Sequence, residues 1–160
     1  MRTLPVLLLT LLSTQVQALP RVRSEDPSVA AVIASATERS ATFKQLIVMI
    51  QATDGVVYVE EGRCGFGVLS CLWLSVTVSG PFRVLRVRVD RRRRGADCDL
   101  MASIGHELKH AIEVLSEPHV TDLPSMYSFL ERQGRNGLER FETQAAIRVG
   151  LQVGKETCRR

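Results

Sequence analysis

The sequence predicts an α+β fold, in which a small antiparallel sheet packs with helices. Three observations lead to this prediction. Apolar residues recur at helical spacing in the early part of the chain, β-branched residues dominate the middle, and helical spacing returns towards the C-terminus. With 160 residues, of which 45% are hydrophobic, the chain is long enough to bury the core of one compact domain.

The N-terminus has the features of a secretory signal peptide. Arg2 supplies positive charge, Leu4–Leu12 is an apolar run, and Val16–Ala18 offers a cleavage site with a small residue at its end. The run is too short for a stable membrane span, which makes an uncleaved anchor the weaker alternative. We therefore expect residues 1–18 to be removed and residues 19–160 to form one domain. The mature protein is then secreted or periplasmic, without stable membrane insertion.

Two helices are expected at the start of the mature chain, at 28–39 and 41–52. They follow a polar linker at Ser24–Pro27. In the second helix the apolar residues Phe43, Leu46, Ile47 and Ile50 recur at helical spacing. The turn residues Asp54 and Gly55 then end this helix.

Three β-rich segments follow, at Val56–Glu60, Val68–Val78 and Phe82–Asp90. Gly80 and Pro81 separate the last two. In the last segment, arginines alternate with Leu and Val, which is typical of a strand in a sheet with one wet face. Because the segments are short and closely spaced, we expect them to pair in an antiparallel sheet.

Three more helices are expected after the sheet. The first covers about 98–115, with Asp97 or Asp99 as its cap, and the sequence Glu117–Pro118 stops it. The second lies near 122–133, and the third runs from about Leu138 to Val153.

The chain has four cysteines, and all of them lie after the predicted cleavage site. Secretion favours their oxidation, and four cysteines allow three pairings. We expect Cys64 to pair with Cys71, because a local hairpin can bring them together, and Cys98 to pair with Cys158. A zinc site made by thiolates is not expected, because the sequence has no C-x-x-C motif.

The formal net charge of +4 says little about partners. The basic run Arg91–Arg94 is typical of a solvated loop; alternatives are an acidic-substrate patch, an anion site and a processing site. No aromatic residue is interleaved with this run, so we expect no nucleic-acid partner.

The predicted helix at 98–115 contains the motif H-E-x-x-H, formed by His106, Glu107 and His110. On a helix the two histidines are one turn apart and can reach the same metal ion. They fall opposite the apolar face of this helix, whereas a core histidine would be expected on that face. Because the chain has only three histidines, chance is a weak explanation for the motif.

A catalytic zinc site needs a third protein ligand, and Glu142 is the main candidate. It lies in the middle of an apolar stripe of the predicted last helix, where a buried carboxylate must be paired or bound to a metal. Pairing with an arginine would be the structural alternative. Glu113 and His119 are the other candidate ligands, and Glu113 could instead orient a ligating imidazole.

The motif His106-Glu107-x-x-His110 with a later Glu142 resembles the gluzincin group of zinc metallopeptidases. The resemblance implies a zincin-like active-site helix, a Zn²⁺ cofactor held by His106, His110 and Glu142, and Glu107 as the catalytic base. It implies a strand that borders the cleft and pairs with an extended substrate, and Phe82–Asp90 is expected to support the site.

The segments Tyr58–Cys64, Gly105–Glu113 and Phe141–Ala146 also resemble a group of small secreted bacterial proteins with no established activity. One departure from the gluzincin pattern is Ala146, because many members have Asp there to hold a histidine. Glu113 or Asp122 would then have to supply this support. No residue is securely assigned to stabilise the transition state, and Tyr127 is a weak candidate.

The expected function is therefore that of a secreted zinc-dependent metallopeptidase, with a peptide or protein as substrate. The alternative is a secreted binding module that keeps a zincin-like scaffold and a structural or vestigial zinc site. A third interpretation is a disulfide-stabilised, arginine-rich domain that binds polyanions without a metal.

Overall fold

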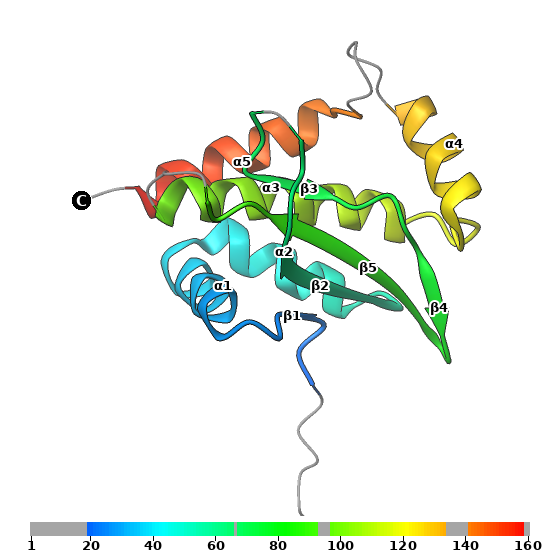
Figure 1. Ribbon diagram of the computed structural model, residues 1–160, viewed down its shortest axis with the longest axis horizontal. Coiled ribbons are helices and arrows are strands. Elements are labelled where there is room, and N and C mark those ends of the chain that lie inside the picture. The colour runs from blue at the N-terminus through cyan, green and yellow to red at the C-terminus, as the bar shows by residue number, and fades with distance from the viewer. Residues whose placement is uncertain (1–18, 66, 93–96, 134–140, 159–160) are drawn as a thin grey trace, which may run out of the picture.

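The computed structural model describes residues 19–65, 67–92, 97–133 and 141–158. The predicted signal peptide at 1–18 and the arginines Arg93 and Arg94 lie outside these residues. The elements are β1 (Val22–Arg23), α1 (Pro27–Arg39), α2 (Ala41–Gln51), β2 (Gly55–Glu61), β3 (Ser70–Leu72), β4 (Thr77–Ser79), β5 (Phe82–Val89), α3 (Asp97–Leu115), α4 (Leu123–Gln133) and α5 (Gln144–Thr157) (Figure 1).

The predicted α+β class is confirmed, but the sheet is mixed and not antiparallel. Strand β5 lies in its middle, parallel to β2 on one side and antiparallel to β3 and β4 on the other. Strand β1 extends the sheet beyond β2, again in parallel. After β2, the chain first forms β3 and β4, which lie on the far side of the sheet's middle position. It then fills that middle position with β5. Of the closely spaced strands, β4 and β5 therefore pair in sequence order, whereas β2 and β3 do not pair with each other.

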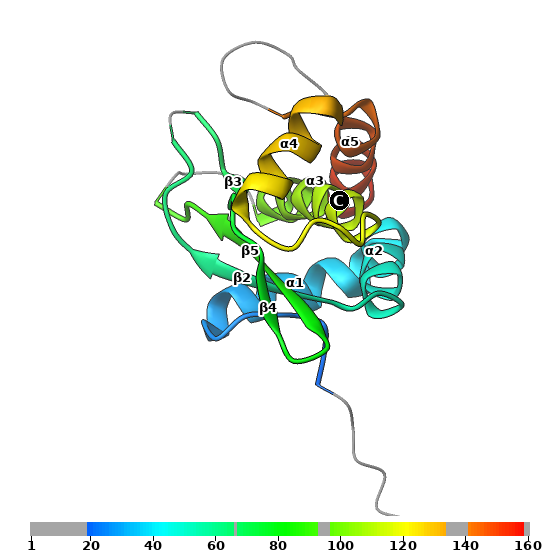
Figure 2. The ribbon, with the colours of Figure 1, turned by 90° about the vertical axis from the view of Figure 1, so that its right-hand side faces the viewer.

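Helices cover one face of the sheet. Figure 2 shows α2, α3 and α5 gathered on one side of the strands. The buried strand residues alternate along β2 and β5, and those that face the helices include Val57, Val59, Leu85 and Val87. They form the core with apolar residues of α1, α2 and α3. Helix α5 packs on α3, so the H-E-x-x-H helix lies between the sheet and α5.

Both predicted disulfides are confirmed. Cys64 pairs with Cys71, but they do not close a hairpin, because β2 and β3 lie on opposite sides of β5. Their bond links the loop after β2 to β3. Cys98 pairs with Cys158 and joins the first turn of α3 to the end of α5. Two disulfides indicate an oxidising compartment.

The predicted helices all occur, with one important change of boundary. The last helix begins at Gln144, with Thr143 as its N-cap, rather than near Leu138. The Thr143 hydroxyl accepts a hydrogen bond from the amide of Ala146. This N-cap satisfies a backbone donor of the first turn and so favours a helix start at Gln144. Within the described residues, no helix is long and apolar enough to cross a membrane.

A buried arginine joins three parts of the fold. Arg83 in β5 forms a two-pronged ion pair with Asp54, with both N–O distances at 2.8 Å. The same guanidinium donates to the carbonyl groups of Leu115, Glu117 and Val120 at 2.7 to 3.1 Å. Those carbonyls lie at the C-terminal end of α3 and just after it. Arg83 therefore fixes where the H-E-x-x-H helix ends relative to the sheet.

A carboxylate near the C-terminus of α5 stabilises the start of α2. Glu156 accepts hydrogen bonds from the Thr42 amide at 3.1 Å and the Thr42 hydroxyl at 2.8 Å. It also accepts from the Ser40 hydroxyl and from Gln152. Partial burial opposes ionisation, but these hydrogen bonds outweigh it and lower the pKa of Glu156 to about 2. The negative charge also interacts favourably with the N-terminus of α2.

The Arg83 network predicts that Arg83→Met lowers the free energy of unfolding by about 3 kcal/mol. The substitution keeps an unbranched side chain but removes the guanidinium group, which leaves Asp54 and three carbonyl groups without their donor. Urea unfolding at pH 7 measures the change, with Arg86→Met on the exposed part of the same strand as the control. A loss below about 1 kcal/mol, equal to that of the control, would contradict the role assigned to Arg83.

The Glu156 contacts predict a stability difference that depends on pH. Because the folded pKa lies below the ordinary value of 4.5, ionised Glu156 stabilises the fold above pH 4.5. This contribution is lost as the pH falls from about 4.5 to about 2. Glu156→Gln should therefore cost roughly 1–2 kcal/mol at pH 7, after allowance for solvent screening, and little near pH 2.

Urea unfolding of both proteins across this pH range measures the difference. Glu131→Gln on α4 is the matched control, because its carboxyl group is not part of the α2–α5 contact. A difference that stays constant from pH 7 to pH 2 would argue against an electrostatic origin.

Candidate metal centre

The three predicted ligands come together in the structure. His106 Nε2 lies 3.1 Å from His110 Nε2 and 3.1 Å from Glu142 Oε2. His110 Nε2 lies 3.9 Å from the same carboxylate oxygen. Among the described residues these three side chains form a group whose geometry could hold one metal ion. The two imidazoles and the carboxylate thus converge on one point with the correct atoms.

Glu142 reaches this point from a different element than predicted. It does not lie on a helix but two residues before α5, in the segment that leads into Thr143, the N-cap of that helix. The predicted helix began near Leu138 and would have included Glu142, but the observed helix begins only at Gln144. The side chain is about one-third exposed, so the point of convergence is accessible from this side.

Each histidine is also held at its outer side. His110 Nδ1 lies 3.0 Å from Glu113 Oε2. Glu113 in turn accepts from the Thr143 hydroxyl at 2.9 Å and pairs with Lys109 at 3.4 Å. The His106 ring makes a hydrogen bond to the backbone of Ala146. A ligating histidine needs such an outer contact to fix its tautomer and orientation.

These contacts bear on Ala146, where the sequence has no carboxylate to hold a histidine. The backbone of Ala146 makes a hydrogen bond with His106 at this position. Glu113 supports the other histidine, as the sequence suggested. Asp122 does not take part, because its carboxylate caps the start of α4 through Ser125.

The electrostatics favour positive charge where the imidazoles converge. Burial lowers the pKa of His110, but contacts with Glu113, Glu142 and Glu107 outweigh it and raise that pKa to about 9. Burial and the neighbouring His110 lower the pKa of His106. The surrounding carboxylates thus favour positive charge on the His110 ring, and His110 would have to release its proton before it could bind a metal.

Glu107, the predicted catalytic base, is displaced around α3 from the histidines towards the sheet, and it lies close enough to His110 and Glu142 for their charges to act on it. It is 7% exposed, and its Oε2 accepts a hydrogen bond of 2.7 Å from the Leu72 amide in β3. The Ser70 hydroxyl also contacts it, and Ser70 is itself bonded to Ser103 of α3. Burial, opposed by these hydrogen bonds and by His110, raises the pKa of Glu107 to about 7. A carboxyl group with this pKa can accept and release a proton near neutral pH.

Close packing of α5 against α3 makes the convergence possible. A Cβ added at Gly150 would lie 3.1 Å from the Cβ of His106, and one at Gly105 would lie 2.9 Å from Val153. Both helices therefore use glycine where they approach each other. This contact also buries the polar face of α3, which the sequence alone would leave at the surface.

The remaining candidates lie elsewhere. His119 is exposed in the loop after α3 and is not part of the group. Tyr127 packs edge-to-face against Phe141, with 5.5 Å between ring centroids, which is a packing contact. The expectation that β5 borders a cleft is wrong, because β5 is paired along both of its edges. Strand β3 is the one that lies beside Glu107.

Sequence reasoning missed the residues that hold the site together. Thr143 binds Glu113, and Ser70 and the Leu72 amide bind Glu107. Thr143 lies within the segment Phe141–Ala146 noted in the sequence, but it was given no role there. The signal available for it was a threonine directly before a helix, which is typical of an N-cap. Nothing local could have indicated that β3 lies beside α3.

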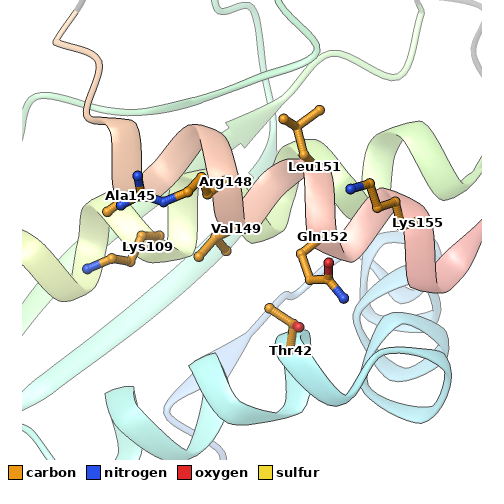
Figure 3. Close-up of a pocket in the computed structure, with 8 residues that line it drawn as sticks. All are labelled: Thr42, Lys109, Ala145, Arg148, Val149, Leu151, Gln152 and Lys155. Carbon is orange, nitrogen blue, oxygen red and sulfur yellow. The ribbon is translucent and has the colours of Figure 1, made fainter.

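The outer surface of α5 carries a shallow groove with a volume of about 570 Å³. Figure 3 shows the side chains that line it: Thr42, Lys109, Ala145, Arg148, Val149, Leu151, Gln152 and Lys155. None of them belongs to the ligand group. Its lining comes from α2 and α3 as well as α5, and Lys109 of α3, which pairs with Glu113, connects it to the edge of the candidate metal centre.

Comparison of the chain with models of known families, with curated proteins and with solved structures found no match in any of the three.

Proposed function

We propose that the protein is a secreted zinc-dependent hydrolase that cleaves peptide bonds. The convergence of His106 Nε2, His110 Nε2 and Glu142 Oε2 carries this proposal. Two imidazoles and one carboxylate are a donor set typical of catalytic zinc. Each histidine also has a supporting contact: Glu113 contacts His110, and the backbone of Ala146 contacts His106. A chance cluster on a helix surface would not need such contacts.

The separations between the donor atoms fit a zinc ion. Ligands bound at about 2.0–2.1 Å in tetrahedral geometry lie about 3.3 Å apart. The observed separations of 3.1, 3.1 and 3.9 Å bracket this value. Three protein ligands leave one position for water or substrate, as in catalytic sites. When bound, zinc would supply a Lewis acid that polarises a carbonyl group and lowers the pKa of water.

In the proposed reaction Glu107 moves the proton. Its carboxylate removes a proton from the attacking water, and the new C–O bond forms at the carbonyl carbon of the peptide. The C–N bond then breaks, and Glu107 delivers the same proton to the leaving nitrogen. Oε2 stays with the Leu72 amide, so the proton travels on Oε1. Strand β3, which lies antiparallel to β5 and beside Glu107, is the strand that would border an extended substrate.

One observation favours a second function, that of a binding module with a structural zinc site. Glu107 is almost fully buried, and its hydrogen bonds to Leu72 and Ser70 tie α3 to β3. A residue with this environment can serve the fold alone. In that case zinc would stabilise the contact between α3 and the segment before α5, and the surface would recognise a partner.

The ligand group predicts about one zinc ion per purified chain. His106→Ala and Glu142→Ala should each lose it, because two remaining ligands hold zinc poorly. Glu113→Gln should keep zinc with an affinity lower by about 10- to 100-fold, because it only orients His110. Inductively coupled plasma mass spectrometry and competition with a chelator measure content and affinity.

His119→Ala is the matched control, since it removes an exposed histidine outside the group. Loss of zinc from His106→Ala but not from Glu142→Ala would move the third ligand to another residue. A wild-type protein that stays free of zinc after zinc is supplied would contradict the metal site altogether.

The role of Glu107 predicts that Glu107→Gln removes peptide hydrolysis while zinc stays bound. The rate should fall by at least about a hundredfold, because glutamine cannot accept the proton. A library of fluorescence-quenched peptides measures turnover by the zinc-loaded protein. Glu61→Gln, at an exposed position at the end of β2, is the control for a lost carboxylate. A zinc-loaded wild type without turnover on the library would favour the binding module instead.

A further inference from the structure

The face of the sheet turned away from the helices carries an ordered set of arginines. Along β5 the residues between the buried positions are exposed or half-buried, and they include Arg86 and Arg88. Tyr58 and Glu60 lie beside them on β2, in register with Arg86 and Arg88. Helices α2, α3 and α5 lie on the other side of the strands (Figure 2), and the exposed Arg86 and half-buried Arg88 show that this face is open to solvent.

Each of four arginines on this face lies over an aromatic ring. The pairs, with the distance from the guanidinium carbon to the ring centroid, are Arg21 over Phe82 (4.2 Å), Arg23 over Tyr58 (4.7 Å), Arg86 over Tyr58 (5.7 Å) and Arg88 over Trp73 (3.5 Å). We call this set the arginine face. Stacking holds a guanidinium flat and reduces its rotamer freedom, while the N–H groups at its edge stay able to donate.

The arginine face already binds one carboxylate. Glu60 lies between two of the arginines, 2.8 Å from Arg86 and 3.4 Å from Arg88. By strand alternation it is the one acidic side chain among the described strand residues of this face. Glu60 and, at Arg21, the charge of Asp54 balance two of the four guanidinium groups, so the surface keeps an excess of positive charge. The geometry of Glu60 shows that a carboxylate fits between neighbouring arginines here.

We propose that the arginine face binds an acidic polysaccharide, an extended chain with regularly repeated carboxylate groups. Strands lie about 4.8 Å apart and residues i and i+2 about 6.7 Å apart, so the arginines form a flat array that several anionic groups of one polymer can contact. The two disulfides indicate an oxidising compartment, where such polymers occur outside the cell.

The aromatic rings argue for a polysaccharide over a nucleic acid. Single-stranded nucleic acids bind through bases that stack on aromatic side chains. Here a guanidinium group lies over one face of each of the rings of Phe82, Tyr58 and Trp73, although Trp73 stays 42% exposed. A ligand on this face therefore meets mainly charge and hydrogen-bond donors from arginine. In the basic run Arg91–Arg94, for which an anion site was one alternative to a solvated loop, the two described arginines have partners of their own: Arg91 contacts Ser28, and Arg92 pairs with Asp90.

The test measures binding of the folded protein to polygalacturonate and to heparin by calorimetry at low salt. Neutral dextran, a thymidine 20-mer and vesicles that contain phosphatidylglycerol are the comparison ligands. Arg86→Ser with Arg88→Ser should weaken binding to both acidic polysaccharides at least about tenfold, because each charge-assisted hydrogen bond contributes about a factor of ten. Thermal unfolding checks that the variant is folded.

Two further variants sharpen the test. Arg148→Ser with Lys155→Ser removes the same charge from the groove on α5 and should change binding less than about threefold. Glu60→Gln frees the donors of Arg86 and Arg88 and should tighten binding about threefold, a gain that misfolding cannot imitate. This gain is expected whether or not the protein hydrolyses peptides, so the outcome is independent of the proposed function.

The opposite results overturn the proposal. Absence of binding to both acidic polysaccharides would exclude this ligand class. Equal losses in the two double variants would show that binding follows net charge and not the arginine face. Tighter binding of the thymidine 20-mer or of the vesicles, lost with Arg86→Ser and Arg88→Ser, would assign the face to another class of ligand.

Discussion

The bonds of Arg83 are the constraint on which the rest of the structure depends. One buried guanidinium fixes the turn before β2, the middle strand and the carbonyl groups at the end of α3. A charged group is costly to bury, and only a full set of partners makes its position favourable. The axis of α3 is therefore set from its C-terminal end. Everything that the helix presents, on its sheet side and on its α5 side, takes its position from this anchor.

The candidate site lies where α3 is covered on two sides. Towards the sheet, Glu107 reaches the backbone of β3; towards α5, the histidines reach Glu142 and the backbone of Ala146. The two functional groups of the motif are thus separated around one helix and held by different neighbours. This division gives the carboxylate a dry environment and leaves the imidazoles beside a partly exposed carboxylate. The same helix can therefore supply both a base and a ligand pair without their competing for partners.

Much of this arrangement followed from local patterns in the sequence. The helix that carries His106 and His110 and both disulfide pairs were predicted, because helical spacing and cysteine positions are local or covalent signals. The parallel pairing of β2 with β5 was not predicted, because alternation identifies a strand but not its neighbours. Glu142 was predicted as a ligand, but on a helix, because the apolar stripe extends to residues before Gln144. The N-cap at Thr143 instead starts the helix after Glu142. Arg83 was overlooked because it resembles the exposed arginines of the same strand.

The disulfide between Cys98 and Cys158 has a consequence for how the ligands find one another. Helices α3 and α5 run antiparallel, and the bond closes a covalent ring of the chain with a sequence separation of 60 residues. His106, His110 and Glu142 all lie within that ring. Even before the chain folds, the ring limits how far the carboxylate can move from the imidazoles and so raises their effective concentration towards each other. Oxidation thus prepares the chain for a ligand set whose members are distant in sequence.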